Sequence, residues 1–427
     1  MHSEAAKQLA AFIVSMLRKD KLVSAVDALR YNVAMDIDIV IGANYGDEGK
    51  GLTAEFCCRQ HSSPIVVLSN GGCQRGHTVD NPERGIRHVF HHFGSGTLLG
   101  APSVYSKTFL VNPIKFIEEK RELVGIGAAP TAFIAPSCVL QLPVDMFVNQ
   151  SLEKHRGSGK HGSCGWGIWE TQVRNASRGH ALTFKEFASL DHASKVRTVR
   201  EETEAHVFNR LVLEGIEPDV ETLTALMSTG FIEHFIQDFE EMASSTKCLD
   251  SDNLFYIDWG KMCHRDIDAI VVENGQGLLL DKKYAPKDSN RRTDVHSTPS
   301  KCGLEGALEA LGSDVPVDSV STFYVSRTYL TRHGNGPFPE ESSSIKFKDE
   351  TNVFNEYQDN IRFGSFTADS IDSLKNRIKT DSQNSKCNVV LTHGNEVDGS
   401  KLCSALVESN IYRSFDANSQ NIERFNA

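Results

Sequence analysis

The stretch Asp36-Ile-Asp-Ile-Val-Ile-Gly42-Ala-Asn-Tyr-Gly46-Asp-Glu-Gly-Lys50-Gly51 joins a short apolar run to a glycine-rich loop. An apolar run of this length that ends in glycine is typical of a buried strand that leads into a loop. The same pattern predicts four further strands, at residues 64–68, 269–273, 322–325 and 388–391. Helical stretches lie between them, so the sequence predicts an α/β fold with a large, mostly parallel sheet flanked by helices. In such a fold the loops that bind ligands gather at the C-terminal ends of the strands.

Composition excludes several classes of protein. The 427 residues include 45 Lys+Arg and 56 Asp+Glu, a formal net charge of −11. A chain this acidic lacks the positive field that non-specific nucleic-acid binding needs, so nucleic acid is not an expected partner. No apolar run approaches the roughly 20 residues that span a bilayer, so no membrane association is expected. The ten cysteines are scattered without CxxC pairs, which indicates reduced thiols in a cytoplasmic protein.

The order of helical and strand patterns along the sequence predicts an N-terminal helical extension over residues 1–35 and a single domain over 36–427. It also predicts a helical insertion in that domain at about 182–250. Within that insertion, helical periodicity predicts one helix over Val199–Leu213 and a second from Pro218 through Phe239. Trp166 and Trp169 are predicted to be packing residues.

The glycine loop has the ingredients of a phosphate site. Gly46, Gly49 and Gly51 let backbone N–H groups approach phosphate oxygens, and Lys50 adds a mobile positive charge at a helix start. Because the glycine spacing is longer than in a Walker A motif, the loop is P-loop-like rather than regular. A plain strand-to-helix turn that happens to hold a lysine is the alternative.

A second loop, Gly71-Gly72-Cys73-Gln74-Arg75-Gly76-His77-Thr78, follows the next predicted strand. In a parallel sheet it would lie at the same edge as the first loop, so His77 would converge with Asp47 on one ligand. A carboxylate inside a phosphate loop repels the ligand unless Mg²⁺ lies between them or the carboxylate acts as an acid or base. The pair therefore predicts acid–base chemistry beside a phosphate.

These motifs carry a resemblance to a known family. GDEGKG (46–51) followed by GG-xxx-GHT (71–78) resembles adenylosuccinate synthetase, and four further segments agree in order. They are HHFGSGTLLG (91–100), HGSCGWGIWET (161–171), ENGQGLLLD (273–281) and TRHGNGPFPEE (331–341). The resemblance implies a ligase that joins L-aspartate to C6 of IMP, driven by GTP hydrolysis through a 6-phosphoryl intermediate.

The resemblance assigns four catalytic residues. Asp47 is the base that removes the N1 proton, and His77 is the general acid on the phosphate side. Lys50 neutralises charge on the transferring phosphoryl group. Gln276 contacts the purine. Mg²⁺ is the implied cofactor, held by Asp47 and the backbone carbonyl of Gly76.

The resemblance also implies the binding residues. The nucleotide and phosphate set is Gly46, Glu48, Gly49, Gly51, Gly76, Thr78, Gln74, Ser163, Cys164, Arg174 and Asn395. Arg174, or alternatively Arg178, matches an arginine that the family contributes across a homodimer. Arg362 matches an arginine that binds the incoming aspartate.

The sequence departs from the family where the triphosphate base is read. The family has Thr-Lys-x-Asp, whereas this chain has Thr392-His393-Gly394-Asn395. Asparagine offers one acceptor and one donor in place of a carboxylate, so either GTP or ATP can be the energy donor. A phage and archaeal branch acts on GMP or dGMP to make a 2-aminoadenine precursor, and that reaction is the alternative to IMP ligation. A degenerate nucleotide-binding regulator is the third reading.

Overall fold

The computed structural model describes residues 35–285, 296–298, 300–312, 314–343, 345, 347, 354–406 and 409–425. The predicted N-terminal helical extension therefore lies outside the described residues, apart from Met35.

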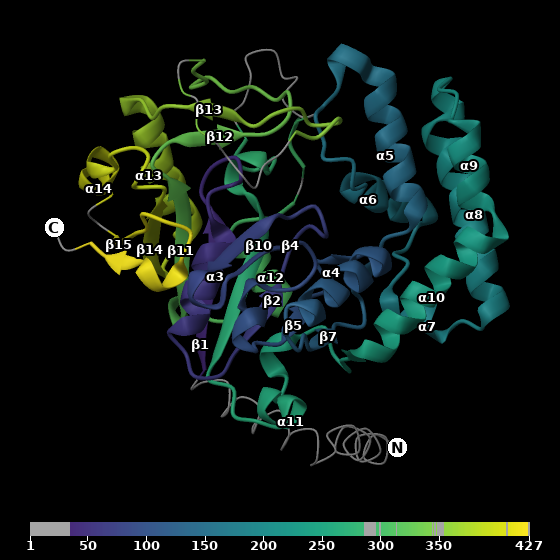
Figure 1. Cartoon of the computed structure of the whole chain (residues 1–427), viewed down its shortest axis with the longest axis horizontal. Helices are drawn as coiled ribbons and strands as arrows, with labels where there is room; N and C mark the ends of the chain where they lie inside the picture. The colour runs from purple at the N-terminus through teal and green to yellow at the C-terminus, as the bar shows by residue number, and fades with distance from the viewer. Residues whose placement is uncertain are drawn as a thin grey trace, which may run out of the picture.

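A central sheet of ten strands, counted over the described residues, organises the chain (Figure 1). Neighbouring strands are parallel except for the antiparallel pair at one edge, β15 and β16. Across the sheet the strands are β16 (Glu423–Arg424), β15 (Asn410–Arg413), β14 (Lys386–Thr392), β11 (Val320–Arg327), β1 (Asp36–Gly42), β10 (Ala269–Gly277), β2 (Pro64–Leu68), β5 (Ser103–Tyr105), β7 (Ala132–Ile134) and β9 (Thr246–Cys248). The five strands predicted from the sequence are the consecutive central ones, from β14 to β2, which confirms the mostly parallel α/β fold.

Helices cover both faces of the sheet, and β1 shows how the two cores divide. Val40 packs into one core, whereas Ile39 and Ile41 pack into the other, because successive side chains of a strand point to opposite faces. All three side chains are fully buried. A strand buried on both faces favours consecutive apolar residues, and this explains the run Ile39-Val40-Ile41 in the second half of β1.

The remaining elements surround this sheet. Three short two-stranded sheets are formed by β3 (His77–Asn81) with β4 (Ile86–Phe90), β6 (Leu110–Val111) with β8 (Val139–Leu140), and β12 (Leu330–Arg332) with β13 (Arg362–Gly364). The α-helices of the described residues are α3 (Lys50–Arg59), α4 (Pro113–Gly125), α5 (Pro143–Arg156), α6 (Ile168–Arg178), α7 (Phe184–Ser189), α8 (His192–Arg210), α9 (Val220–Met227), α10 (Thr229–Ser245), α11 (Trp259–Cys263), α12 (Leu304–Leu311), α13 (Ala368–Ser382) and α14 (Ser400–Ala405).

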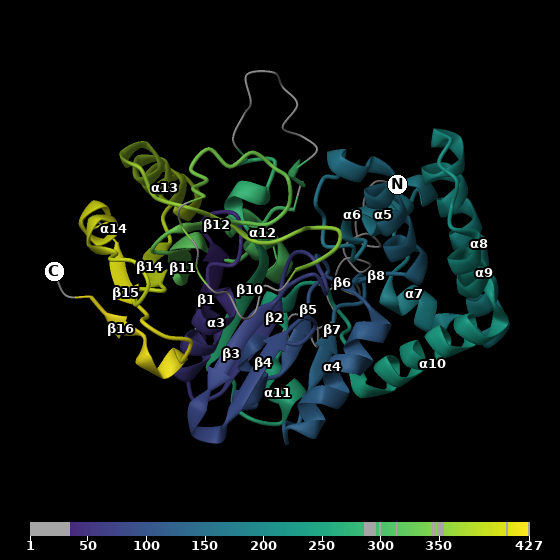
Figure 2. The same ribbon diagram turned by 45° about the horizontal axis from the view of Figure 1, so that its top comes forward.

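The segment predicted as a helical insertion contains α7 to α10, which lie together on the side of the molecule opposite the yellow C-terminal strands (Figures 1 and 2). The helix predicted over Val199–Leu213 begins earlier, at His192, because the Asp191 side chain accepts a hydrogen bond from Ser194 N and caps it. The second predicted helix is divided at Ser228. Its hydroxyl accepts from Phe231 N and starts α10 as a separate helix.

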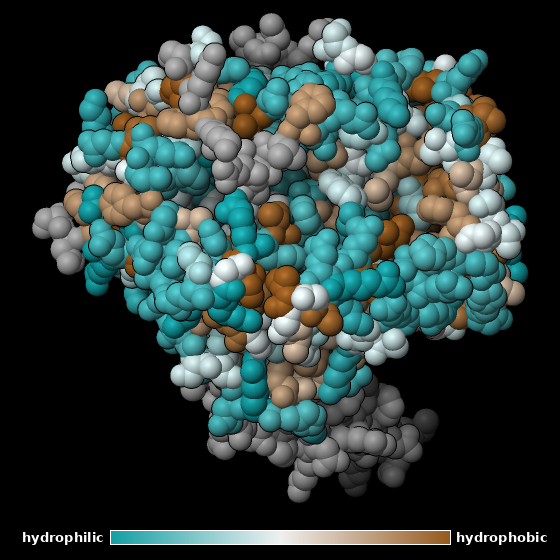
Figure 3. Space-filling view, in the orientation of Figure 1, coloured by the Kyte–Doolittle hydropathy of each residue, from teal (hydrophilic) through white to brown (hydrophobic). Residues whose placement is uncertain are grey.

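The polarity of the molecular surface agrees with the charged and polar composition of the chain. The face seen in Figure 3 is mostly hydrophilic, with apolar residues in small scattered groups. Over the described part of the chain, no helix has the length and apolar character needed to cross a membrane.

The doubly buried strands make a prediction about stability. Replacing Ile39 by Ala should lower the free energy of unfolding by about 2–5 kcal/mol, because the change leaves a cavity at the centre of the sheet. Chemical denaturation followed by circular dichroism measures this. Val220→Ala, at a side chain that is 72% exposed, should cost less than about 0.5 kcal/mol. Equal costs at the two positions would contradict the assigned core.

Candidate functional site

The glycine-rich loop predicted to bind phosphate runs from the end of β1 to the start of α3, and the buried Glu48 side chain holds it in place. Glu48 Oε1 accepts hydrogen bonds from Asn44 N at 3.0 Å and Gly46 N at 2.8 Å. Its Oε2 pairs with Lys50 Nζ at 2.8 Å. Burial opposes the ionisation of Glu48, but Lys50 and the two N–H groups outweigh it and hold the pKa of this carboxyl below its usual value. Glu48, predicted to bind the nucleotide, is fully buried and braces the loop instead.

The loop opens onto a cavity of about 870 Å³ at the C-terminal ends of the central strands. All four residues predicted as catalytic lie on its wall: Asp47, Lys50, His77 and Gln276. Nine of the predicted binding residues line the same cavity: Gly46, Gly49, Gly51, Gln74, Gly76, Thr78, Ser163, Cys164 and Asn395. The structure therefore brings together residues that are separated by up to 349 positions in the sequence.

His77, at the start of β3, is oriented by a carboxylate that the sequence analysis did not single out. Its Nδ1 hydrogen-bonds Glu273 Oε1, and both side chains are buried. Burial lowers the pKa of His77 to about 4, so the ring is neutral at pH 7. Because the proton on Nδ1 faces a carboxylate, Nε2 is the nitrogen left for a ligand. The clue in the sequence was the acidic last residue of the apolar run AIVVE (269–273).

Three further groups hold Glu273 in its charged form. Ser95 donates to it from both its backbone N, at 2.9 Å, and its hydroxyl, at 2.8 Å. The Arg75 guanidinium lies 3.8 Å away and is completely buried. Burial alone would raise the pKa of Glu273, but His77 and Arg75 beside it bring that pKa below its ordinary value. Glu273 can therefore keep accepting the His77 proton at neutral pH.

Asp47 occupies a strained backbone position at the mouth of the loop. Its φ of 59° is in the left-handed region, which few non-glycine residues adopt. Its carbonyl oxygen accepts from Arg327 Nε at 2.5 Å, and His333 Nε2 lies 3.4 Å from its Oδ2. These contacts hold the carboxylate on the cavity wall. Neither Arg327 nor His333 was expected from the sequence.

The donor atoms present fit a magnesium ion. The Asp47 carboxylate and the Gly76 backbone line the same cavity, and oxygen donors are the ligands that Mg²⁺ prefers. In the described ranges, no group of three or more His, Cys, Asp or Glu side chains is placed to hold a metal. One carboxylate with ligand phosphates is nevertheless the usual arrangement for Mg²⁺ in phosphoryl-transfer sites.

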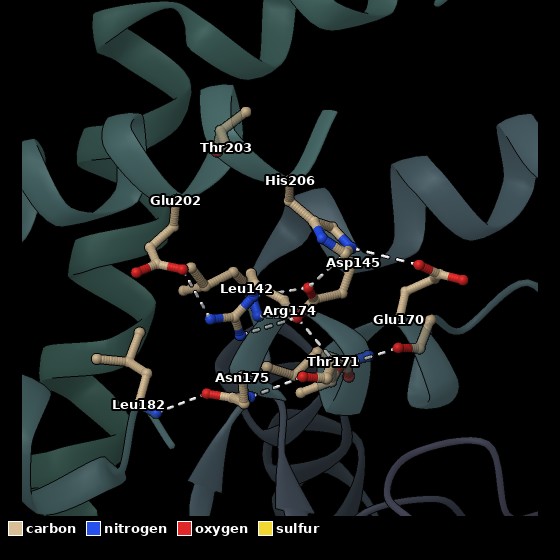
Figure 4. A network of polar contacts seen from close by, with 12 residues as sticks. Leu142, Asp145, Glu170, Thr171, Arg174, Asn175, Leu182, Glu202, Thr203 and His206 are labelled. Carbon is tan, nitrogen blue, oxygen red and sulfur yellow. Dashed lines mark hydrogen bonds and ion pairs between the residues drawn. The ribbon is translucent and has the colours of Figure 1, made fainter. Parts of the chain in front are cut away.

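Arg174 lies away from the cavity of its own chain. It is absent from the lining of the cavity and only 2% exposed, in a buried polar network between α5, α6 and α8 (Figure 4). Its Nε and Nη2 bind the two oxygens of Asp145 at 2.8 and 3.1 Å, and Nη2 also donates to Leu140 O. Glu202, on α8, is a further partner at 3.4 Å. These contacts engage the guanidinium within the chain.

The two other predicted arginines are also engaged within the chain. Arg178 pairs with Glu186 at 2.8 Å and with Glu202 at 3.0 Å, both in the helical insertion. Arg362 donates to the carbonyl oxygens of Gly334 and Gly336 and pairs with Glu341 at 2.8 Å. Arg362 is not part of the cavity wall, and it closes the loop after β12 instead.

Trp166 and Trp169, predicted to be packing residues, line the cavity, and the Trp169 side chain is 42% exposed. The prediction was wrong because α6 begins at Ile168 with its first turn facing the cavity. Ser163, beside them, exchanges hydrogen bonds with the Asn149 amide at 2.9 and 3.2 Å.

The arrangement defines a mostly parallel α/β protein with a glycine-rich loop, a carboxylate and an oriented imidazole at its strand ends, and comparisons with known proteins give its family. The family model for adenylosuccinate synthetase matches residues 39–363. The adenylosuccinate synthetase of Yarrowia lipolytica is 27% identical over 322 residues, which cover 71% of this chain and 66% of the relative. That of Gloeobacter violaceus is 29% identical over 307 residues, 71% of this chain and 63% of the relative.

Two solved structures share the fold. A fully ligated adenylosuccinate synthetase from Plasmodium falciparum has a TM-score of 0.66 at 14% identity, covering 92% of this chain and all of the other. The succinoaminodeoxyadenylate synthetase of cyanophage S-2L, bound to dGMP and dATP, has a TM-score of 0.60 at 13% identity, covering 92% and 96%. The chain belongs to the adenylosuccinate synthetase family. The sequence matches span just under two thirds of the curated relatives' length.

The position of Arg174 predicts a structural role. Arg174→Leu should lower the free energy of unfolding by about 3–5 kcal/mol, because Asp145 would be left buried without its partner. Arg174→Leu combined with Asp145→Leu should restore part of that loss. Denaturant titration of both variants measures it, with Arg121→Leu, at an exposed pair, as a control expected to cost about 1 kcal/mol or less. A variant as stable as the wild type but unable to bind nucleotide would instead return Arg174 to a ligand role.

Proposed function

We propose that this chain is a purine-nucleotide:aspartate ligase, which joins L-aspartate to C6 of IMP with hydrolysis of a nucleoside triphosphate, either GTP or ATP. The observation that carries the proposal is the convergence of Asp47, Lys50, His77 and Gln276 on one cavity at the strand ends. A protein that only bound nucleotides would have no need of both a base and an oriented imidazole beside a phosphate loop.

The chemistry needs a base first. The 6-oxo group of the purine is a poor leaving group, so it must be phosphorylated before an amine can replace it. Asp47 takes the N1 proton, and the O6 atom then attacks the γ-phosphorus as the bond from that phosphorus to the β–γ bridging oxygen breaks. The contacts of Asp47 with Arg327 and His333 support this role, because a base must be held in position to be effective.

Lys50 and His77 serve the phosphoryl group. The Lys50 ammonium, which Glu48 holds at the loop, offsets the negative charge that develops on the transferring oxygens. The Nε2 side of His77 faces the ligand, because Glu273 occupies Nδ1. When the amine of aspartate attacks C6, the C6–O6 bond breaks and phosphate leaves. The charge of the bound phosphates and of Glu273 favours the protonated His77 ring, which then donates a proton from Nε2 to the leaving phosphate as the acid.

Asp47 and the Gly76 carbonyl would hold Mg²⁺ together with phosphate oxygens, and the ion would supply charge neutralisation at the phosphates.

A cytoplasmic location is supported by the net negative charge of the chain and by ten cysteines that form no disulfide bonds. A homodimer remains a prediction from the family, and Arg174 gives it no support.

The same chemistry on GMP or dGMP is the second candidate, favoured by the similarity in fold to the cyanophage enzyme bound to dGMP. The retained Asp47 favours IMP as the substrate, since members of the GMP and dGMP branch commonly replace the loop aspartate to admit the 2-amino group.

A product screen by mass spectrometry distinguishes IMP from GMP or dGMP as the substrate. Purified protein with Mg²⁺ and aspartate is given IMP, GMP or dGMP, each with GTP or ATP. An adduct on IMP is expected, and an adduct on GMP or dGMP alone would move the enzyme to the other branch. No adduct in any mixture, with nucleotide still bound, would favour a regulator.

The base role of Asp47 makes a sharp prediction. Asp47→Asn should lower the rate of adduct formation by at least about a hundredfold, because an amide cannot take the N1 proton. Binding of a fluorescent nucleotide should remain measurable. Asp318→Asn, an exposed carboxylate away from the cavity, is the matched control. Unchanged turnover in Asp47→Asn would remove this residue from the base role.

His77→Asn should also slow adduct formation by about a hundredfold or more, because the acid on the phosphate side is lost. Steady-state rates and the unfolding midpoint are measured together, so that a loss of activity is not confused with a loss of fold. His180→Asn, at an exposed histidine that is not on the cavity wall, should behave as the wild type. Full activity in His77→Asn would exclude the acid role.

A further inference from the structure

A buried arginine on the cavity wall has no anionic partner among the residues that the structure describes. Arg332, the last residue of β12, lines the cavity and is only 3% exposed. Its Nε has no hydrogen-bond partner there, and the ionisable groups that act on it are the Tyr45 hydroxyl and the Arg362 guanidinium, with no carboxylate of the described chain. Arg174, which is buried to a similar degree, is paired with Asp145. Because an unpaired buried charge is costly, the surroundings of Arg332 point to an anionic ligand.

The chain around Arg332 fixes the guanidinium at the wall. Its central carbon lies 4.4 Å from the centroid of the Tyr45 ring, in a cation–π contact. A Cβ on Gly336 would lie 1.8 Å from Arg332 Nη2, so only glycine leaves room for the guanidinium at that position. Tyr45 and Gly336 both line the cavity. A cation held in place before the ligand arrives loses little freedom on binding.

The residues on either side of Arg332 contact the loop that carries the proposed base. Before it, Thr331 Oγ1 donates a hydrogen bond to Gly46 O at 3.1 Å. After it, His333 Nε2 lies 3.4 Å from Asp47 Oδ2. In the proposed reaction Asp47 takes the proton from N1 of the purine, and C6, where the amine attacks, is the next atom of the ring. Arg332 therefore lies at the end of the cavity where the amine donor must bind.

We propose that Arg332 binds a carboxylate of the amine donor, an inference that rests on the proposed function of this site. The guanidinium presents parallel N–H groups that match the two oxygens of a carboxylate. The 5′-phosphate of the purine nucleotide is the other anion to consider, but it lies beyond the ribose, at the far end of the nucleotide from N1. An amine without a carboxylate would leave the guanidinium unpaired, so Arg332 makes the site select an acidic amine donor.

The position of Arg362 supports this assignment. The sequence analysis gave Arg362 the role of binding the incoming aspartate. Its Nη2 donates instead to the carbonyl oxygens of Gly334 and Gly336, and it is not part of the cavity wall. Arg332 takes over the role because its guanidinium is on the wall and lacks a carboxylate partner in the described chain.

Calorimetric titration of the full-length chain tests the assignment without turnover. The protein is saturated with Mg²⁺ and the β,γ-imido analogues of GTP and ATP, which do not transfer their terminal phosphate, and with IMP or, in a parallel set, dGMP. L-Aspartate is then titrated in, and the wild type should bind it. Arg332→Gln should weaken that binding by about tenfold or more, because a charge-assisted hydrogen bond is lost, whereas the affinity for the monophosphate should change less than about threefold.

Gly336→Ala tests the same point while keeping the charge. Its methyl group would displace the Arg332 guanidinium, so it should weaken the binding of L-aspartate more than that of the monophosphate. Arg121→Gln, at an exposed arginine that is not on the cavity wall, is the control and should bind both ligands as the wild type does. The unfolding midpoint is recorded for each variant, and if Arg332→Gln does not fold, Gly336→Ala carries the comparison.

The outcomes separate the two anions. If Arg332→Gln loses the monophosphate but keeps L-aspartate, the guanidinium holds the 5′-phosphate and the assignment is overturned. Equal losses of both ligands, unchanged binding of both, or no binding of L-aspartate by the wild type would also overturn it. If the product screen yields no adduct, the proposed ligase function fails, yet the titration with L-aspartate still decides the role of Arg332.

Discussion

The buried carboxylate of Glu48 is the constraint on which the active-site geometry depends. It satisfies two backbone N–H groups of the loop and the Lys50 ammonium at once. The surrounding chain is shaped to leave room for it. A Cβ on Gly42 would lie 2.6 Å from Glu48 Oε2, and one on Gly277 would lie 2.8 Å from Oε1. Strands β1 and β10 must therefore both end in glycine for the carboxylate to fit.

The sequence predicted the centre of the fold and the position of the site well, for one physical reason. Strands buried on both faces contain consecutive apolar residues, and β1 (39–41), β2 (65–68) and β10 (269–272) each contain such a run. Loops that follow such strands must meet at one edge of the sheet, so Asp47 and His77 could be placed together. Short strands such as β5 and β7, three residues each, carry no such signal.

The residues that sequence reasoning missed act through tertiary contacts. Glu273 and Arg327 are charged residues within apolar strands, and their partners lie far away in the chain. The contacts of Arg174 within the chain were also not expected, since Asp145 and Glu202 come from two other helices. Charge type could be read from the sequence, but the choice of partner depends on how α5, α6 and α8 pack (Figure 4).

The contacts that join Asp47, Arg327, Tyr329 and Glu396 have a consequence for protein engineering. Arg327 donates through Nε to the backbone of Asp47 and through Nη1 to the Tyr329 hydroxyl, which binds Glu396. A substitution of Arg327 would therefore disturb the loop of Asp47 and the hydrogen bond to Tyr329 at the same time. Asn395 lines the cavity but takes no part in this series of contacts, so a library of variants at that position would reshape the cavity wall while leaving the support of Asp47 intact.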